Sequence, residues 1–275
     1  MNEKEIKEFV LTVIPDYFTF RIQRMNRPRA YYVVIKDTIA DIEFHVEIDL
    51  NLVSNDREKP YIKNKIVHAL VFYKKHQSQL EEELKPFEQF FFGGVHIHHY
   101  PSTNKRYIWF IAKRNGDEDY TTVRIYDNKT EIDHGDSTHR KKHKQDKFQL
   151  FDVVSIDGEK GRIMSKKSKN RHTAKIEHYT SVAGFVPEDE ITLIKHTSLP
   201  TLNIGDEVVI HDIPDHEQNT YPLGWTMPDT FIYQYDKPRR ITDIMFNPKL
   251  NIPSYQIDNE YWFTPYHLEK NIAKD

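Results

Sequence analysis

One hydrophilic stretch, residues 133–147, constrains the fold of this 275-residue chain more than any other feature. It contains no apolar side chain and is rich in lysine and histidine. A segment of this kind has nothing to bury in a hydrophobic core. We therefore predict a basic hydrophilic linker there, between a first domain of residues 1–132 and a second part that begins at residue 148.

The composition excludes several kinds of chemistry. The chain has no cysteine, so it can form no disulfide, no thiolate zinc site and no cysteine nucleophile. Its first residues lack the apolar segment of a secretion signal, and no run of residues is apolar enough to span a bilayer. Neither a P-loop, a dinucleotide-binding glycine motif nor a nucleophile elbow occurs. We expect a cytoplasmic protein without membrane contact or cofactor, and the pattern favours a binding protein over an enzyme.

Charge is distributed unevenly along the chain. Residues 139–175 hold 12 Lys and Arg against 4 Asp and Glu, a net +8, whereas residues 176–275 hold 7 against 16, a net −9. A basic stretch of this kind suits a nucleic-acid partner, and a solvated linker gives the same count.

The first domain repeats one pattern, a helix followed by three alternating strands. Helices are expected over residues 3–14 and 60–84, and strands over residues 18–24, 30–36, 42–50, 95–100, 106–113 and 120–126. This order predicts an α+β domain, a pseudo-duplicated α-β-β-β with one antiparallel sheet and both helices on one face. Chance recurrence of the hydrophobic pattern is the alternative.

The second part is expected to form two all-β modules, residues 148–197 and 198–275. In the first module, Asp157-Gly158 separates two short alternating strands as a hairpin turn would. In the second, Gly205-Asp206 leads into an alternating apolar strand.

The second part resembles tandem SH3-like β-barrels. The segments that carry the resemblance to the Mind-bomb type are residues 205–210, Leu223-Gly224-Trp225-Thr226-Met227, and Tyr261-Trp262-Phe263 with Leu268-Glu269. Residues 152–164 followed by residues 186–191 resemble a more generic SH3-like or KOW-like barrel. An insertion over residues 231–253 departs from the compact pattern. The resemblance implies peptide, protein or nucleic-acid binding without catalysis.

Aromatic residues of the second barrel are candidates for protein binding: Trp225, Tyr261, Trp262 and Phe263. Aromatic side chains line the peptide grooves of SH3 domains. The alternative is that they form the barrel core.

Two basic clusters are candidates for nucleic-acid binding. They consist of Arg21, Arg24, Arg27, Arg29, Lys105 and Arg106 in the first domain, and of Lys141, Lys142, Lys166, Lys167, Lys169 and Arg171 further along. The first cluster lies beside Tyr31, Tyr32, Tyr107 and Trp109, and phosphate contacts combined with stacking suit an unpaired strand. The alternative is aromatic side chains in the sheet core and arginines that only solvate loops.

His96 and His98 are two residues apart on an expected strand, so their side chains leave the same face. With His45, Glu43 or Glu47 on a neighbouring strand, they could hold zinc or manganese. A metal-dependent phosphodiesterase or nuclease is therefore the alternative function. The simpler interpretation is a solvated sheet face that happens to be rich in histidine.

Together these patterns predict a non-catalytic binding or adaptor protein with a protein partner and, as a second ligand, nucleic acid. The tandem-module style is compatible with a phage or mobile-element product that binds and inhibits a host protein or a nucleic-acid-processing factor. The oligomeric state stays open.

Overall fold

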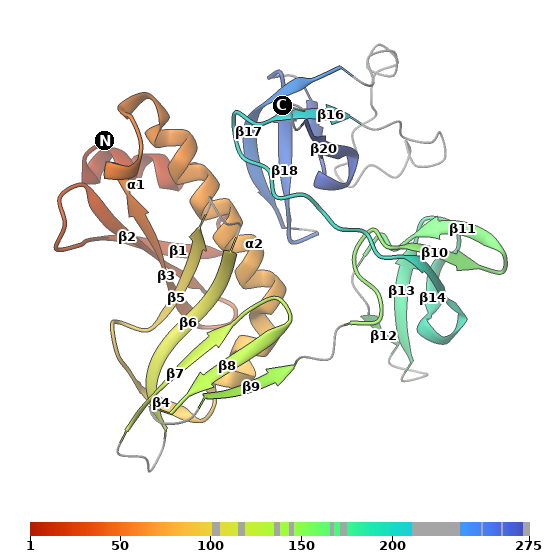
Figure 1. The fold of residues 1–275 in the computed structure, drawn as a ribbon, viewed down its shortest axis with the longest axis horizontal. Coiled ribbons are helices and arrows are strands. Elements are labelled where there is room, and N and C mark those ends of the chain that lie inside the picture. Colours follow the sequence, from red (N-terminus) through yellow and green to blue (C-terminus); the bar gives the residue numbers. More distant parts are fainter. Residues whose placement is uncertain are drawn as a thin grey trace. The chain divides into compact units, whose positions relative to one another are not determined.

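A computed structural model describes residues 1–100, 105–114, 119–134, 138–142, 146–165, 168–170, 175–210, 237–248, 250–259 and 261–271. These residues lie mostly in strands, with one long helix (Figure 1). The chain divides into two compact units, one of residues 1–144 with 244–253 and one of residues 145–243 with 254–275. Neither described α-helix is long and apolar enough to cross a membrane.

The first unit contains two helices and a nine-stranded sheet. Its elements are α1 (Glu3–Leu11), β1 (Phe18–Arg24), β2 (Ala30–Asp37), β3 (Ile42–Asp49), the 3-10 turns η1 (Leu50–Leu52) and η2 (Asn55–Arg57), α2 (Glu58–Leu84), β4 (Phe87–Phe90), β5 (Val95–Tyr100), β6 (Lys105–Arg114), β7 (Tyr120–Ile125), β8 (Lys129–Asp133) and β9 (Thr138–Lys142).

Local sequence explains where the two helices form. The Asn2 side chain accepts from the Glu5 backbone N–H while the Glu5 side chain accepts from the Asn2 backbone, a capping box that starts α1. α2 buries one apolar stripe against the sheet, where Tyr73 stacks on Phe44 with ring centroids 4.5 Å apart. α1 lies beside α2, with the Lys59 ammonium 5.9 Å from the centre of the Phe9 ring.

The sheet order is β1-β2-β3-β5-β6-β7-β8-β9, and β4 also pairs with β6. The α-β-β-β order therefore occurs in both halves, with β4, β8 and β9 added. The prediction of an antiparallel sheet is wrong at one place, because β3 and β5 pair in parallel. The physical reason is α2, whose 27 residues form the long crossover that adjacent parallel strands require.

β9 lies inside the segment that the sequence predicts to be a linker. Thr138–Lys142 pairs with β8, although every one of its side chains is exposed. It joins the sheet through backbone pairing, and its exposed side chains add ion pairs of Arg140 with Glu131 and of Lys141 with Glu83. Charged side chains on an edge strand discourage it from pairing with another strand. An edge strand can therefore have the same composition as a hydrophilic linker.

A four-residue bulge, residues 91–94, interrupts the pairing along β6. Phe90 is opposite Ala112 and His96 is opposite Trp109, so the residues between β4 and β5 loop out of the sheet. Phe92, Gly93 and Gly94 all have positive φ values, of 54°, 82° and 120°. β4, between α2 and this bulge, is a strand that the sequence patterns do not predict.

The second unit begins with two three-stranded sheets, β11-β10-β15 and β12-β13-β14. Their elements are β10 (Val153–Ile156), β11 (Glu159–Arg162), β12 (Ser168–Lys169), β13 (Ile176–Thr180), β14 (Gly184–Pro187), the 3-10 turn η3 (Glu188–Glu190) and β15 (Thr192–Lys195). A bridge between Ile163 and Thr180 connects the sheets. Between them lies a core of Phe148, Val154, Ile156, Ile163, Val186 and Ile191.

A five-stranded sheet of order β19-β18-β17-β16-β20 follows along the chain; its residues 244–253 belong to the first unit and its other residues to the second. It consists of β16 (Glu207–Ile210), β17 (Arg239–Asn247), β18 (Ile252–Ile257), β19 (Tyr261–Phe263) and β20 (Leu268–Lys270), with the 3-10 turn η4 (Pro265–His267) before β20. Both sets of strands share one arrangement. The last strand follows a 3-10 turn and pairs with the first, β15 with β10 and β20 with β16.

Candidate nucleic-acid interface

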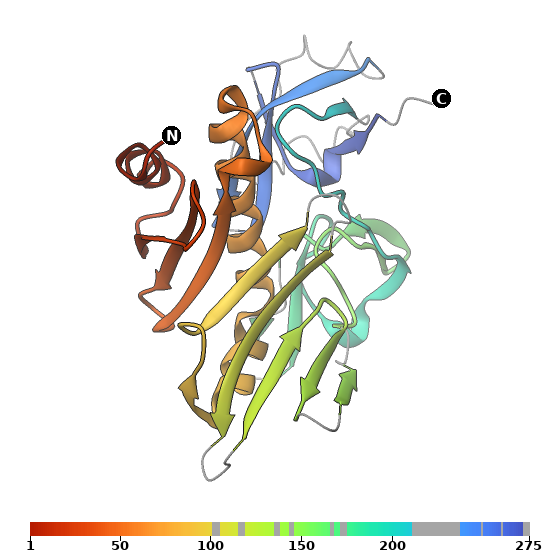
Figure 2. The ribbon, with the colours of Figure 1, turned by 60° about the vertical axis from the view of Figure 1, so that its left-hand side comes forward.

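The two faces of the first sheet differ in what covers them. α2 runs along one face (Figure 2), and the contact between Phe44 and Tyr73 shows which side chains point to it. Alternation along β3 therefore places Glu43, His45 and Glu47 on the opposite face. We call this opposite face the open face.

A continuous row of rings lies on the open face. The row, which we call the ring row, consists of Tyr32, His45, His96, His98, Tyr107, Trp109 and Tyr126. The ring centroids of His45 and His96 are 4.7 Å apart. His96 stacks on Trp109 at 4.8 Å, with the ring planes 19° apart.

The row continues towards β7. His98 stacks on Tyr107 with ring centroids 5.4 Å apart and planes 13° apart. Tyr107 in turn lies 5.4 Å from Tyr126, the residue that follows β7. Strand register assembles the whole row, because His45 is paired with His96, His96 with Trp109 and His98 with Tyr107.

The ring row has a buried floor and half-buried upper rings. His45 and His96 are only 3% and 2% exposed, whereas Tyr32, His98, Trp109 and the other two tyrosines are half-buried. Half-buried rings on a sheet keep part of their aromatic surface available to a flat ligand. This is the arrangement that a stacking surface requires.

Burial keeps the histidines of the ring row neutral. It lowers the pKa of His45 to about 4, an effect to which the neighbouring His96 adds. It also lowers the pKa of His98 to about 4 and moves the pKa of His96 down. The His96 Nε2–H donates to the Phe92 carbonyl at 2.8 Å. Neither ring nitrogen of His45 has a hydrogen-bond partner among the described residues.

Cations surround one end of the ring row. Alternation and register on β6 to β9 place five of them on the open face near Tyr107 and Tyr126, and we call this group the positive flank: Lys105, Arg124, Lys129, Arg140 and Lys142. The carboxylates on the same part of the face are Asp133 and Glu131, and Glu131 lies 2.6 Å from the Lys129 ammonium and 3.5 Å from Nε of Arg140. The Lys129 ammonium lies 4.8 Å from the centre of the Tyr126 ring, and the Lys105 ammonium 5.8 Å from it.

The arginines of the first basic cluster have partners within the fold. Arg21 forms a two-fold hydrogen-bonded ion pair with Glu43, one contact of which is 2.8 Å. Arg27 pairs with Glu47 at 2.5 Å and with Asp49 at 3.2 Å. Arg29 pairs with the buried Glu58. These three arginines therefore fasten β3 and α2 to the first hairpin.

The remaining basic candidates are scattered. Lys105 and Lys142 join the positive flank, whereas the Arg106 guanidinium lies 5.6 Å from the Phe72 ring of α2, on the helix-covered side. Lys141 lies 3.6 Å from Glu83 of α2. Two of the others, Arg24 and Lys169, are exposed. Lys166, Lys167 and Arg171 lie outside the described residues.

The aromatic residues predicted to bind protein do not form one exposed surface. Phe263 is fully buried in its sheet, and Tyr261 and Trp262 are half-buried. Trp225 lies outside the described residues. The burial of Phe263 supports the alternative interpretation, in which this side chain belongs to the core.

His96 and His98 leave the same face of β5, as the sequence predicts, with their ring centroids 6.4 Å apart. In the part of the chain that the structure describes, no three His, Asp or Glu side chains come together in a way that could hold a metal ion. The nearest carboxylate oxygen to a ring nitrogen of His45 is Oε1 of Glu43, at 3.9 Å. The histidine rings contact aromatic rings instead.

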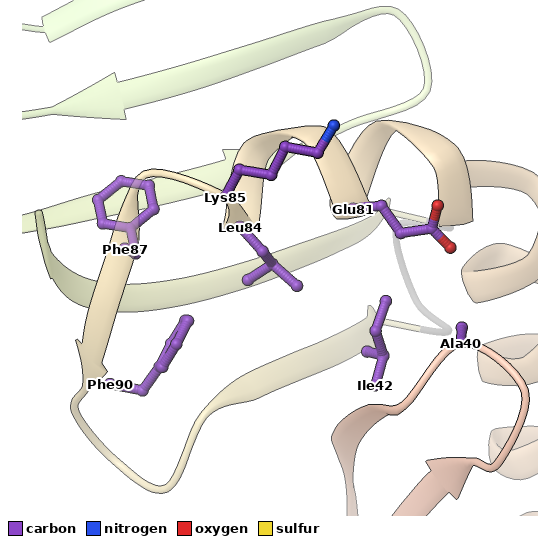
Figure 3. A pocket seen from close by; sticks show the side chains of 7 residues that line it. All are labelled: Ala40, Ile42, Glu81, Leu84, Lys85, Phe87 and Phe90. Carbon is purple, nitrogen blue, oxygen red and sulfur yellow. The ribbon is translucent and has the colours of Figure 1, made fainter.

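A shallow cavity of about 430 Å³ lies elsewhere, at the end of α2 (Figure 3). Its lining is mainly apolar: Ala40, Ile42, Leu84, Phe87 and Phe90, with Glu81 and Lys85. Figure 3 shows the Lys85 ammonium pointing away from the two phenylalanine rings. The cavity therefore lacks the converging polar groups that a specific small-molecule site needs.

No protein family, curated protein or solved structure matches this chain. The chemistry of the interface consequently rests on its own residues. Neutral stacked rings beside a cluster of cations can hold flat aromatic groups that are joined to anionic groups. The sequence patterns single out six of the seven rings, three for stacking (Tyr32, Tyr107 and Trp109) and three for metal (His45, His96 and His98). They miss Tyr126, which follows β7, and the cation Arg124 on β7.

Proposed function

We propose that this chain is a non-catalytic binding protein whose open face holds an unpaired nucleic-acid strand. The observation that carries the proposal is the ring row, which ends beside the positive flank. Bases would stack on the half-buried rings, and phosphates would lie against the cations.

The size of the ring row fits a short piece of single strand. The row extends from β2 to β7, and its four steps between neighbouring strands, at about 4.8 Å each, make it about 19 Å wide. Open sheets that bind RNA stack about two or three bases on their aromatic side chains. Paired bases bury both of their faces in the helix, so the same surface should reject a duplex.

The proposal includes a protein partner for the second unit, as an adaptor requires. Support comes from the shared strand arrangement, in which the last strand follows a 3-10 turn and returns to the first. That arrangement is compatible with two SH3-like barrels in tandem, which would serve as the partner-binding modules. Inhibition of a host factor is the role we propose for such a partner complex.

Fluorescence anisotropy with a labelled single-stranded oligonucleotide of about 12 nucleotides tests the nucleic-acid proposal, with the matching duplex as a competitor. We expect Trp109→Ala to weaken binding about tenfold, because stacking on one aromatic side chain contributes about 1–3 kcal/mol per base. Phe185→Ala is the matched control, since Phe185 is an exposed aromatic residue of the second unit. Equal affinity of wild type and Trp109→Ala would contradict the proposal.

Salt dependence tests the positive flank separately. For a single strand, the slope of log K against log salt changes by about 0.7 for each phosphate contact. Arg124→Gln with Lys142→Gln should therefore make the slope about 1.4 smaller. Lys4→Gln with Lys7→Gln, which removes the same charge from α1, should leave it unchanged. Both double variants carry the same net charge, so equal slopes in the two would contradict phosphate binding at the positive flank.

A further inference from the structure

Phe92 stands out among the aromatic residues beside the ring row. Its ring is 61% exposed, and its backbone has a φ of 54°. A bulky side chain in this left-handed region is uncommon and costs about 1–3 kcal/mol, and such strain is found at ligand clamps and active sites. Neither the exposure nor the strain is explained by packing within the sheet.

Contacts with the floor of the ring row hold Phe92 in this conformation. The His96 Nε2–H donates to the Phe92 carbonyl at 2.8 Å, which fixes the backbone of the bulge above β5. The next residue, Gly93, lies so close to His45 that an added Cβ would be 3.2 Å from the imidazole Cε1. Phe92 and Gly93 of the bulge therefore contact the two buried histidines, His96 and His45.

The Phe92 ring lies at the edge of the stacking surface. Its centroid is 6.2 Å from that of Trp109, and the two ring planes are 60° apart. A base held between two rings needs about 7 Å between them, two layers at normal carbon–carbon contact distance. A shift of about 1 Å and a rotation of the Phe92 side chain would create that space. An added Cβ at Gly94 would meet nothing within 4 Å, so that side of the bulge has room to move.

We infer that Phe92 is the upper half of a base clamp and closes one unpaired base against Trp109. The inference rests on the proposed function, and it adds a specific ligand-contacting residue that lies outside the sheet strands. The Phe91 ring lies edge-on to Phe92 with centroids 4.7 Å apart, and it also contacts the ring of Tyr120 at 5.2 Å, on the side away from Trp109 in strand register. The adjacent phenylalanine of the same bulge is thus a natural control.

The test compares the affinity of single-stranded oligonucleotide for wild type, Phe92→Ala, Phe92→Gly and Phe91→Ala. Loss of one stacking contact should weaken binding about tenfold in both Phe92 variants and leave Phe91→Ala within about twofold of wild type. Glycine relieves the left-handed strain and alanine does not, so thermal unfolding should distinguish the two Phe92 variants while their affinities agree. If the affinities of the variants correlate with their thermal stability, and not with the presence of the Phe92 ring, the clamp is wrong.

Two further outcomes separate the clamp from the proposed function. If Trp109→Ala weakens binding and Phe92→Ala does not, the clamp is wrong and the stacking surface stands. If wild type shows no affinity for single strands even at low salt, the proposed function fails and the clamp fails with it. Phe92→Tyr, which keeps an aromatic ring, should bind like wild type, and a tenfold loss in that variant would also contradict the clamp.

Discussion

Phe151 and Tyr266 stack with ring centroids 5.0 Å apart and planes 18° apart, which joins the two sets of strands in the second unit. The Arg162 guanidinium carbon lies 4.1 Å from the centre of the same Tyr266 ring. The Thr197 hydroxyl donates to the Phe151 carbonyl at 2.7 Å, so the stacked residue is also fixed through its backbone. An aromatic contact with a cation beside it therefore couples the two strand sets.

Tyr266→Ala should uncouple the two strand sets. Tyr266 is half-buried and loses both the stacking and the cation contact, so we expect a loss of about 2 kcal/mol in unfolding free energy. Urea unfolding should also become broader, because the two sets would no longer unfold together. Tyr179→Ala, at an exposed position of β13, is the control and should cost less than about 0.5 kcal/mol. A variant with wild-type cooperativity would contradict the coupling.

Asp37 is a buried carboxylate on which several groups converge. It lies 2.5 Å from the Lys74 ammonium and accepts from the Tyr73 hydroxyl at 3.1 Å. Asp37→Ala would leave the Lys74 charge without its partner, so we expect a loss of about 3–5 kcal/mol, measured by chemical unfolding. Asp41→Ala removes an exposed pair with Lys36 and should cost less than about 1 kcal/mol. If the two variants lose similar amounts of unfolding free energy, burial of the Asp37–Lys74 pair does not determine its contribution to stability.

The histidines of the ring row predict a loss of stability in acid. The folded pKa of His45 is about 4, below the ordinary value of 6.5. Between these values the unfolded chain binds more protons than the folded chain, so stability is complete above about pH 6.5 and falls as the pH approaches 4. His98 has the same window. Each unit of pKa difference corresponds to about 1.4 kcal/mol.

Thermal unfolding from pH 4 to pH 7 measures this effect. His45→Gln should flatten the profile, because the glutamine amide does not titrate. Charged and titratable groups close to His45 are His96 and Glu43, with Arg21 paired to Glu43, so Glu43→Gln is a useful second variant. His139→Gln, at an exposed position on β9, should keep the wild-type slope. A profile that is equally steep in His45→Gln would exclude His45 as the cause.

At Gly161 we predict a steric clash that a second substitution relieves. A Cβ at this position would lie 2.5 Å from Val182 Cγ2 and 3.1 Å from Ser181 Oγ. Gly161→Ala should therefore destabilise the second unit by about 1–3 kcal/mol, and adding Val182→Ala should restore much of the loss. Gly158→Ala gives a contrast. Its Cβ would meet nothing within 4 Å, but its φ is 86°, so its cost should not respond to Val182→Ala.

The sequence predicted the parts of the fold that depend on local periodicity. Alternation placed Ile42, Phe44 and Val46 on one face of β3 and their neighbours on the other, and the contact of Phe44 with α2 agrees with it. The same reasoning put His96 and His98 on one face of β5. Periodicity of this kind is a property of a single strand, so it can be recognised without knowing the neighbouring strand.

Pairings between distant strands could not be predicted in the same way. β3 and β5 are separated by the whole of α2, and nothing in either strand specifies that they pair in parallel. The sequence suggested phosphate contacts for the arginines of the first cluster. Three of them, Arg21, Arg27 and Arg29, pair with carboxylates of β3 and α2. The register of β1 to β3 brings Arg21 close to Glu43. A basic cluster read along the chain does not show which carboxylates lie across the sheet.

The parallel pairing of β3 with β5 makes the ring row a composite. Tyr32 and His45 come from the strands before α2, and every other ring comes from the strands after it. A chain in which β5 has not yet paired with β3 would therefore carry two separate partial rows, one of two rings and one of five. Affinity for a single strand would then increase when the crossover is complete and the full row is assembled.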